Sequence, residues 1–244
     1  MEEQTTGIIP DRYKILSGSA LKCIALFTMI ADHVGKHLMN GPGIVFLRIG
    51  QSTLSLRSLM TTAGRLAFPI YCFLPAEGFL HTRDRRKYGI NLLLFALISE
   101  IPWNLEHTGT LLYAKQNVFF TLFLGFSGLC CIEGLRTKPR LQLAVLLALL
   151  LTAIFLKADY GVIGFGFILL LYLLRNQRIL QAVLGTCFLT GVSRWVGGLA
   201  FIPINLYNGK RGFIRGPVLK YAFYAAYPLH LFVIYLIKKQ AVGF

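Results

Sequence analysis

Residues 20–39 read ALKCIALFTMIADHVGKHLM. The stretch is long enough to cross a bilayer as an α-helix, which takes about 20 mostly apolar residues. Its second half nevertheless holds Asp32, His33, Lys36 and His37. Ionisable side chains are costly inside a membrane and are normally retained there for function. The stretch therefore predicts a membrane-spanning helix that carries a polar site in its later turns.

The rest of the chain has the composition of a membrane protein. Of its 244 residues, 55% are hydrophobic and only 14% are charged, and its mean hydropathy is +0.62. Soluble domains carry about 25% charged residues. The formal net charge is +15, but the basic residues lie in the gaps between apolar runs. This pattern is typical of membrane loops, and it argues against a nucleic-acid-binding surface on a soluble domain.

Eight apolar stretches predict an all-α, polytopic transmembrane helical bundle. They cover residues 20–39, 63–80, 88–105, 117–135, 141–156, 161–174, 179–202 and 221–237. We expect one transmembrane domain over residues 20–237, between a cytoplasmic N-terminal tail (1–19) and a cytoplasmic C-terminal tail (238–244). The irregular segment 41–62 is expected to include a helix lying in the outer interface. Arg194 interrupts the seventh stretch, so residues 179–220 form either one span or a re-entrant pair.

The loops at 81–87, 136–140 and 175–178 are rich in Lys and Arg, which resist translocation across the membrane. In an eight-span arrangement these loops share one side with both termini, and we therefore place them in the cytoplasm. This arrangement puts 14 of the 25 basic residues inside and 11 outside. The last outer loop, with Lys210, Arg211 and Arg215, is the exception. An anionic partner or lipid head groups would account for it.

Polar side chains from distant parts of the chain fall at the outer depth of this predicted bundle, as in a functional cavity. The set comprises Asp32, His33, Arg65, Glu100, Asn117, Asp159 and Asn205, with His230 near the middle of the last span. A membrane-embedded His flanked by acids is suited to general base catalysis. His33 and His37 share a helix face, but no third ligand is evident in the local sequence, so we expect no metal. Glu106 and Glu133 are interpreted as ordinary helix-end residues.

Residues 21–33 (LKCIALFTMIADH) resemble the opening motif of the TraX family, named for a conjugative-plasmid protein linked to N-terminal acetylation of pilin. The resemblance continues in order through GRLAFP (64–69), EGFLHT (77–82), SEIP (99–102), QNVFFTL (116–122), ADYG (158–161) and YPLHL (227–231). It implies a multi-pass acetyltransferase of the bacterial plasma (inner) membrane that uses acetyl-CoA. It also implies that Asp32 and His33 are the catalytic pair, and that the same cavity is lined by Arg65, Glu100, Asn117 and His230.

On this interpretation acetyl-CoA enters from the cytoplasm, and the donor side holds Arg83, Arg85, Arg86, Lys87 and Glu77. His33 deprotonates an amine of a peptide, or a hydroxyl of a glycan or lipid. Asp32 or Glu100 stabilises the imidazolium, and Arg65 or Asn117 supports the oxyanion. An acetyl-histidine intermediate is an open variant. The substrate cavity is completed by Asp159, Tyr227 and Asn205.

Two other classes of protein compete with the enzyme. A proton-coupled secondary transporter would also hold ionisable residues at mid-depth, but it should show an internal duplication, and none is visible in the motifs. A non-catalytic membrane assembly factor would tolerate a neutral replacement of His33. Acetyl transfer that is lost with His33 separates the enzyme from both alternatives.

Overall fold

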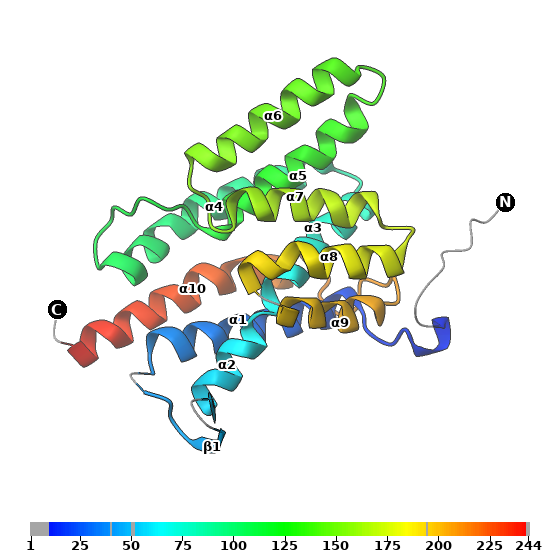
Figure 1. The fold of residues 1–244 in the computed structure, drawn as a ribbon. Helices are drawn as coiled ribbons and strands as arrows, with labels where there is room; N and C mark the ends of the chain where they lie inside the picture. Colours follow the sequence, from blue (N-terminus) through cyan, green and yellow to red (C-terminus); the bar gives the residue numbers. More distant parts are fainter. Residues whose placement is uncertain (1–9, 40, 50–51, 194, 243–244) are drawn as a thin grey trace.

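The computed structural model describes residues 10–39, 41–49, 52–193 and 195–242. Apart from one short hairpin, the described residues form helices and connecting loops (Figure 1). Every apolar stretch of the sequence contains a helix, so the all-α prediction is confirmed. The main helices are α1 (Gly18–His37), α3 (Ala67–His81), α4 (Arg85–Thr108), α5 (Val118–Gly134), α6 (Pro139–Phe155), α7 (Gly161–Leu173), α8 (Arg178–Ser193) and α10 (Gly216–Val242).

Polar residues in the loops set where these helices begin. Ser17 accepts a hydrogen bond from the backbone N–H of Ala20 at the start of α1. Asp84 accepts one from Lys87 at the start of α4, 2.8 Å away. At the other end of α4, Gly109 has a φ of +71°, which glycine adopts without steric cost. Each cap satisfies backbone groups that a helix end leaves unpaired.

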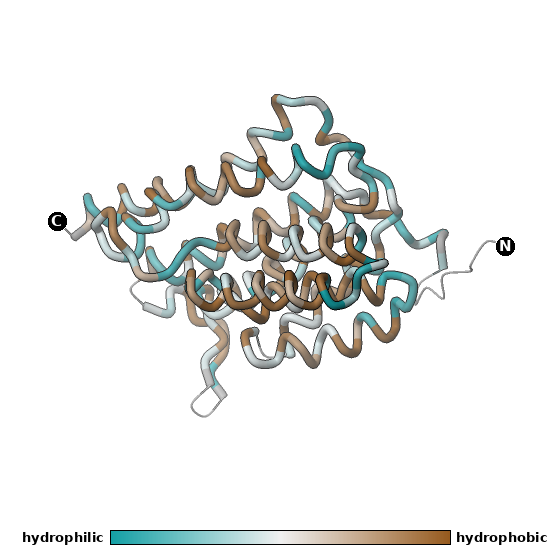
Figure 2. The backbone as a smooth tube through the Cα atoms, turned by 90° about the horizontal axis from the view of Figure 1, so that it is seen from above, coloured by the Kyte–Doolittle hydropathy of each residue, from teal (hydrophilic) through white to brown (hydrophobic). Residues whose placement is uncertain are grey.

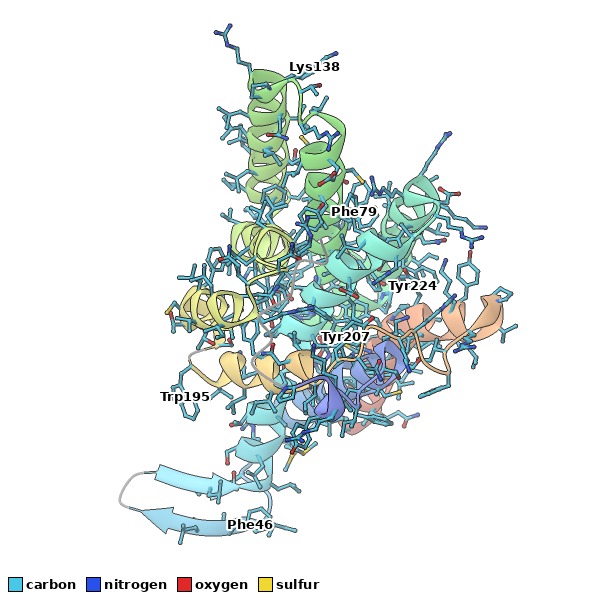
Figure 3. All side chains as sticks on the ribbon, turned by 90° about the vertical axis from the view of Figure 1, so that its right-hand side faces the viewer. Phe46, Phe79, Lys138, Trp195, Tyr207 and Tyr224 are labelled. Carbon is cyan, nitrogen blue, oxygen red and sulfur yellow. The ribbon has the colours of Figure 1, made fainter. Side chains whose placement is uncertain are left out.

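The segment expected to form an interfacial helix is mostly a β-hairpin. Strand β1 (Val45–Ile49) pairs antiparallel with β2 (Ser52–Ser55), and α2 (Leu56–Gly64) follows. Alternating β-branched and apolar residues favour the extended form, and a helix starts only where Ser55 and Ser58 form a capping box. The hairpin projects from the bundle with Phe46 exposed (Figure 3). The predicted helix is therefore confirmed only over α2.

The seventh stretch is not one long span. Helix α8 ends at Ser193, and a 3-10 helix, η2 (Trp195–Ala200), followed by α9 (Phe201–Asn205), runs back along it. A side chain added at Gly197 would meet Ser193, one at Gly198 would meet Thr186, and one at Gly185 would meet Phe201. Small residues allow this close approach. The re-entrant pair is therefore the correct alternative.

This reversal carries the chain back to the start of α1. Leu16 bridges Tyr207, and the backbone N–H of Gly18 donates to the carbonyl of Lys210 over 2.8 Å. Helix α10 consequently starts beside α1 and runs parallel to it (Figure 1). At the far end, His37 of α1 and Lys238 of α10 both contact Glu106. The two described ends of the bundle thus lie opposite each other, and the prediction that both termini share one side is wrong.

We call the end with the start of α1 the basic end and the end with Glu106 the polar end. The segment with Lys210, Arg211 and Arg215 lies at the basic end, not at the outer side as expected. Sixteen described Lys and Arg now share the basic end: Arg12, Lys14, Lys22, Arg83, Arg85, Arg86, Lys87, Arg136, Lys138, Arg140, Arg175, Arg178, Lys210, Arg211, Arg215 and Lys220. Eight lie towards the polar end: Lys36, Arg48, Arg57, Arg65, Lys115, Lys157, Lys238 and Lys239. The fold therefore distributes Lys and Arg more unequally between its two ends, 16 to 8, than the eight-span prediction did, 14 to 11.

The outer faces of the helices are apolar, as lipid contact requires. In α6 the side chains of Leu143, Leu147 and Leu151 are about half exposed, at 59%, 49% and 50%, and apolar residues follow the helices between more polar ends (Figure 2). Contiguous exposed apolar surface of this kind marks a membrane or interaction face. Within the described residues, two helices, α4 and α10, are long and apolar enough to span a membrane by themselves. The helical bundle is confirmed, whereas eight independent spans are not.

Reporter fusions check the opposed ends of the bundle. We expect a fluorescent protein joined before residue 10 to report the cytoplasm, and alkaline phosphatase joined after residue 242 to report the outer side. A reporter in the turn at 136–138 is the control, because that turn lies at the basic end with the start of α1. Finding the N- and C-terminal reporters on one side would contradict the parallel arrangement of α1 and α10.

Candidate functional site

A cavity of about 800 Å³ enters the bundle from the basic end. Its mouth is lined by four cationic residues, Lys22, Arg83, Arg211 and Lys220, and Arg83 and Arg211 are exposed to the surroundings. Its walls come from α1, α3, α4, α5 and α10, and Tyr207 and Tyr224 line it as well (Figure 3). Its deep part is apolar and aromatic, with Met29, Val118, Phe119 and Tyr227. The cavity therefore joins a cationic mouth to an apolar interior.

A pair of histidines lies just beyond the deep end of this cavity. His33 follows Met29 by about one turn of α1, and His230 follows Tyr227 by about one turn of α10. His33 Nδ1 lies 2.7 Å from His230 Nε2, and the two rings lie side by side, with centroids 4.9 Å apart and planes within 28° of parallel. The ring of Tyr227 meets His230 edge to face at 5.4 Å. The structure thus brings together three residues that the sequence placed in one cavity.

Asp32 does not face this histidine pair. Neighbouring residues on a helix point about 100° apart, and Asp32 packs against Gly64 of α2, where any larger residue would clash. Its carboxylate forms an ion pair with Lys36, one turn along α1. Asp32 is 8% exposed, whereas Lys36 is an exposed residue, so the pair lies at the edge of the buried interior. Asp32, one of the two carboxylates expected to stabilise the His33 imidazolium, is therefore paired with Lys36 instead.

Glu100 and Asn117 contact each other and hold α5 against α4. The backbone N–H of Asn117 donates to Glu100 Oε1 over 3.0 Å, and the Asn117 side-chain amide donates both to this carboxylate and to the carbonyl of Ala96. Asn117 Oδ1 accepts from Phe119 and caps α5. Because both amide hydrogens of Asn117 are used, that side chain is not available to support an oxyanion. The pair has a structural role in this state.

Arg65 and Asp159 lie near one another at the polar end. Arg65 donates to the carbonyl of Val192 over 3.5 Å, and both residues interact electrostatically with Tyr160. Asp159 is in the loop between α6 and α7, where burial raises the pKa of its carboxyl to about 6, against opposing interactions with His107 and Lys36. The carboxyl is therefore partly protonated just below neutral pH.

Asn205 lies at the opposite end from this group. Its side chain is buried in α9 and donates to the carbonyl of Phe201. Two residues later, Tyr207 bridges Leu16 at the basic end. Asn205 was expected in the outer cavity because one long seventh span would have carried it there. The reversal after α8 carries it back, so that expectation is wrong.

The residues expected on the donor side are only partly at the cavity. Glu77 and Arg83 line it, and His81 Nε2 lies 2.8 Å from Glu77 Oε1. Arg85 instead lies over the ring of Phe79, and Arg86 and Lys87 are exposed and outside the lining. Three lining cations were missed in the sequence: Lys22, Arg211 and Lys220. Two of them, Arg211 and Lys220, come from a segment that was expected at the opposite end of the bundle from the other basic loops.

Glu106, interpreted from sequence as a helix-end residue, is the most connected acid of the polar end. Its side chain is fully buried, and its oxygens lie 2.8 Å from His37 Nδ1, 2.9 Å from His107 Nδ1 and 3.2 Å from Lys238 Nζ. This cluster joins α1, α4 and α10. A buried carboxylate needs such partners, because an uncompensated charge is costly in a low dielectric. Only the parallel placement of α1 and α10 brings these partners together, and that placement was not foreseen.

The same cluster supplies ligand types that zinc prefers. The ligating atoms of His37, Glu106 and His107 lie within 4.8 Å of one another, so His37 does have candidate partner ligands that the local sequence did not reveal. His107 Nδ1 also lies 2.9 Å from the carbonyl of Trp103, and Lys238 shares the carboxylate. His37, His107 and Lys238 thus surround the Glu106 carboxylate as an ion cluster, in which Oε2 makes no hydrogen bond among the described residues.

Removing Glu106 should destabilise the bundle. We expect Glu106→Ala to cost about 1–3 kcal/mol, because His37, His107 and Lys238 lose a shared partner while Lys238, 31% exposed, can be solvated, and to lower the thermal midpoint in detergent by roughly 5 °C. Glu106→Gln, which keeps an acceptor oxygen, should cost less. Lys239→Ala, one residue beyond Lys238 on an exposed face of α10, is the control. A thermal midpoint of Glu106→Ala equal to that of Lys239→Ala would contradict a stabilising role for the Glu106 cluster.

Comparison with known proteins agrees with the motifs. No solved structure matches the chain. A probable fimbrial assembly protein, FimC of serogroup H1, from Dichelobacter nodosus is 28% identical over 242 residues, which cover 88% of this chain and 93% of that protein. The family described as TraX protein matches residues 17–238, which include every helix from α1 to the last turns of α10. The chain therefore belongs to the TraX family of proteins.

Proposed function

We propose that this protein transfers an acetyl group from acetyl-CoA, bound from the cytoplasm, to an amine or hydroxyl presented from the opposite side of the inner membrane. The observation that carries the proposal is the cavity, which leads from a cationic mouth to an apolar deep end just short of the His33–His230 pair. An acyl donor has phosphates at one end and a thioester at the other. It needs cations at the entrance, an apolar passage behind them and a basic group near the deep end. A non-catalytic protein has no such requirement.

The mouth suits the phosphates of coenzyme A. Lys22, Arg211 and Lys220 lie close enough to influence one another electrostatically, and such clustered cations are favourable only with an anion between them. From Lys22 to His33 is about 16 Å along α1, at 1.5 Å per residue. The extended pantetheine arm has a comparable length. A donor anchored at the mouth would therefore present its thioester near His33.

The chemistry then needs one base and one leaving group. His33 takes a proton from the acceptor, whose nitrogen or oxygen attacks the thioester carbonyl and forms the tetrahedral intermediate. The carbon–sulfur bond breaks as the carbonyl reforms, and the coenzyme A thiolate leaves and accepts a proton. Arg65 is the remaining candidate for stabilising the oxyanion. If His33 itself attacks, an acetyl-histidine forms first and is then consumed by the acceptor.

Charge orients this machinery in the membrane. The basic end would face the cytoplasm, because Lys and Arg are retained there during insertion. The polar end, with His37, Glu106 and His107, would face outward and receive the acceptor. The N-terminal tail would be cytoplasmic, and the end of α10 would be outside. Membrane lipid would contact the apolar outer faces of α6 and α10.

The name of the FimC relative favours a peptide amine of a fimbrial subunit as acceptor. A hydroxyl of a glycan or lipid needs the same base and is the next candidate. The same name also favours a second function, a non-catalytic role in fimbrial assembly. The two functions differ in whether His33 is required.

Labelled acetyl-CoA tests the enzyme directly. We expect purified protein to hydrolyse the thioester slowly and to transfer the label to an acceptor peptide, and we expect His33→Ala to lose about 10²-fold or more of this activity. Phe27→Ala, on the exposed face of the same helix, is the control. If His33→Ala hydrolysed acetyl-CoA or transferred the acetyl group as fast as the unmodified protein, the proposal would be contradicted. Fimbriae assembled normally by His33→Ala cells, without any acetyl turnover, would favour the assembly role.

Substitutions at the cationic mouth of the cavity test donor binding through the KM for acetyl-CoA. We expect Lys22→Glu and Lys220→Glu each to raise KM for acetyl-CoA by about tenfold, equivalent to about 1.4 kcal/mol of binding, with kcat nearly unchanged. Raised ionic strength should weaken donor binding in the unmodified protein. Lys239→Glu makes the same change of charge at the polar end and should leave KM unaltered. An equal rise in KM for Lys239→Glu would contradict donor binding at the mouth.

A further inference from the structure

We propose that His230 is a positioning residue that holds His33 in the tautomer with the proton on Nδ1, so that Nε2 of His33 is the basic atom. The inference rests on the proposed function in that it takes His33 as the base. Sequence reasoning assigned this task to a carboxylate, Asp32 or Glu100. The geometry assigns it to a second imidazole instead.

The first step is the proton on His230. Its Nδ1 lies 3.0 Å from the carbonyl oxygen of Ala226, one turn earlier in α10. A carbonyl oxygen only accepts hydrogen bonds, so Nδ1 of His230 must be the donor. A neutral imidazole has one donor and one acceptor nitrogen. The Nε2 atom of His230 therefore carries a lone pair, and the backbone of its own helix fixes this arrangement.

The second step transfers the constraint to His33. Its Nδ1 lies 2.7 Å from His230 Nε2, and because Nε2 carries the lone pair, Nδ1 of His33 must be the donor in this pair. Its Nε2 is then unprotonated and can accept a proton from the substrate. When it does so, the hydrogen bond to His230 becomes charge-assisted and stabilises the imidazolium. The arrangement performs the orienting task of the aspartate in a Ser-His-Asp triad with a neutral group.

The third step concerns the groups that could replace His230 in this role. Asp32 is paired with Lys36, and Glu100 is bonded to Asn117. Glu106 is bonded to His37, whose ring lies edge-on to His33 with centroids 5.8 Å apart. Packing against Tyr227 also restrains the His230 ring. Among the described residues, His230 is therefore the group that reaches His33 Nδ1 with an acceptor.

The kinetic test compares two replacements of His230. The Oε1 atom of Gln can accept the hydrogen bond from His33, whereas Leu fills similar space without an acceptor. We expect His230→Leu to lower kcat by about 10²-fold or more with KM for acetyl-CoA unchanged, and His230→Gln to retain activity within about tenfold. Leu229→Ala, on the exposed face of α10, is the control. Equal activity of the Leu and Gln variants would overturn the inference.

The tautomer is measured without any turnover. Nitrogen-15 spectra of histidine-labelled full-length protein in detergent at pH 8, with the His33 signals identified by their loss in His33→Ala, should show a protonated Nδ1 and a free Nε2. In His230→Leu these signals should shift towards a mixture of tautomers. A protonated Nε2 on His33 in the unmodified protein would overturn the inference. If the protein shows the expected His33 tautomer but transfers no acetyl group, the proposed function is refuted and the inference about the tautomer stands.

Discussion

The backbone pairing between the start of α1 and the segment after α9 determines the rest of the structure. Gly18 and Ser19 donate to the carbonyls of Lys210 and Arg211, over 2.8 and 2.9 Å. These bonds place the first residues of α10 beside those of α1, so that the two helices run parallel. His33 and His230 then lie at equal heights, 15 and 14 residues from the starts of their helices. An antiparallel α10 would separate them.

The same pairing sorts the charges of the molecule. It adds Lys210, Arg211 and Arg215 to the end that already holds the other basic loops, and it completes the cationic mouth of the cavity. At the opposite end it brings Lys238 to Glu106, where two histidines share the carboxylate. The interior between the ends is apolar and aromatic. A cavity of this kind offers a cationic entrance to an anionic group and an apolar interior to a chain attached to it, and it ends next to a pair of imidazoles.

Much of the local structure could be predicted from sequence, because runs of about 20 apolar residues leave an α-helix as the stable local choice in lipid. Each such run contains a helix, and the polar loops with Ser17 and Asp84 cap them as expected of those residues. The acids could be recognised as unusual, but their partners could not. Asp32 faces Lys36 and Gly64, Glu100 anchors Asn117, and Glu106, interpreted as ordinary, is the buried centre of a cluster. Which partner an acid finds depends on helix rotation and direction, and these are set by packing.

By itself, the sequence determined that this is a helical membrane protein with the TraX motifs and with His33 inside a span, because composition and motif order are local properties of the chain. The tertiary structure decided three further points. First, residues 179–205 turn back on themselves through close contacts at Gly185, Gly197 and Gly198. Second, α10 runs parallel to α1, opposite to the direction in the eight-span prediction. Third, the partner of His33 is an imidazole instead of a carboxylate. The physical reason is that apolar periodicity identifies a helix but not its direction. Direction depends on contacts between residues nearly two hundred positions apart.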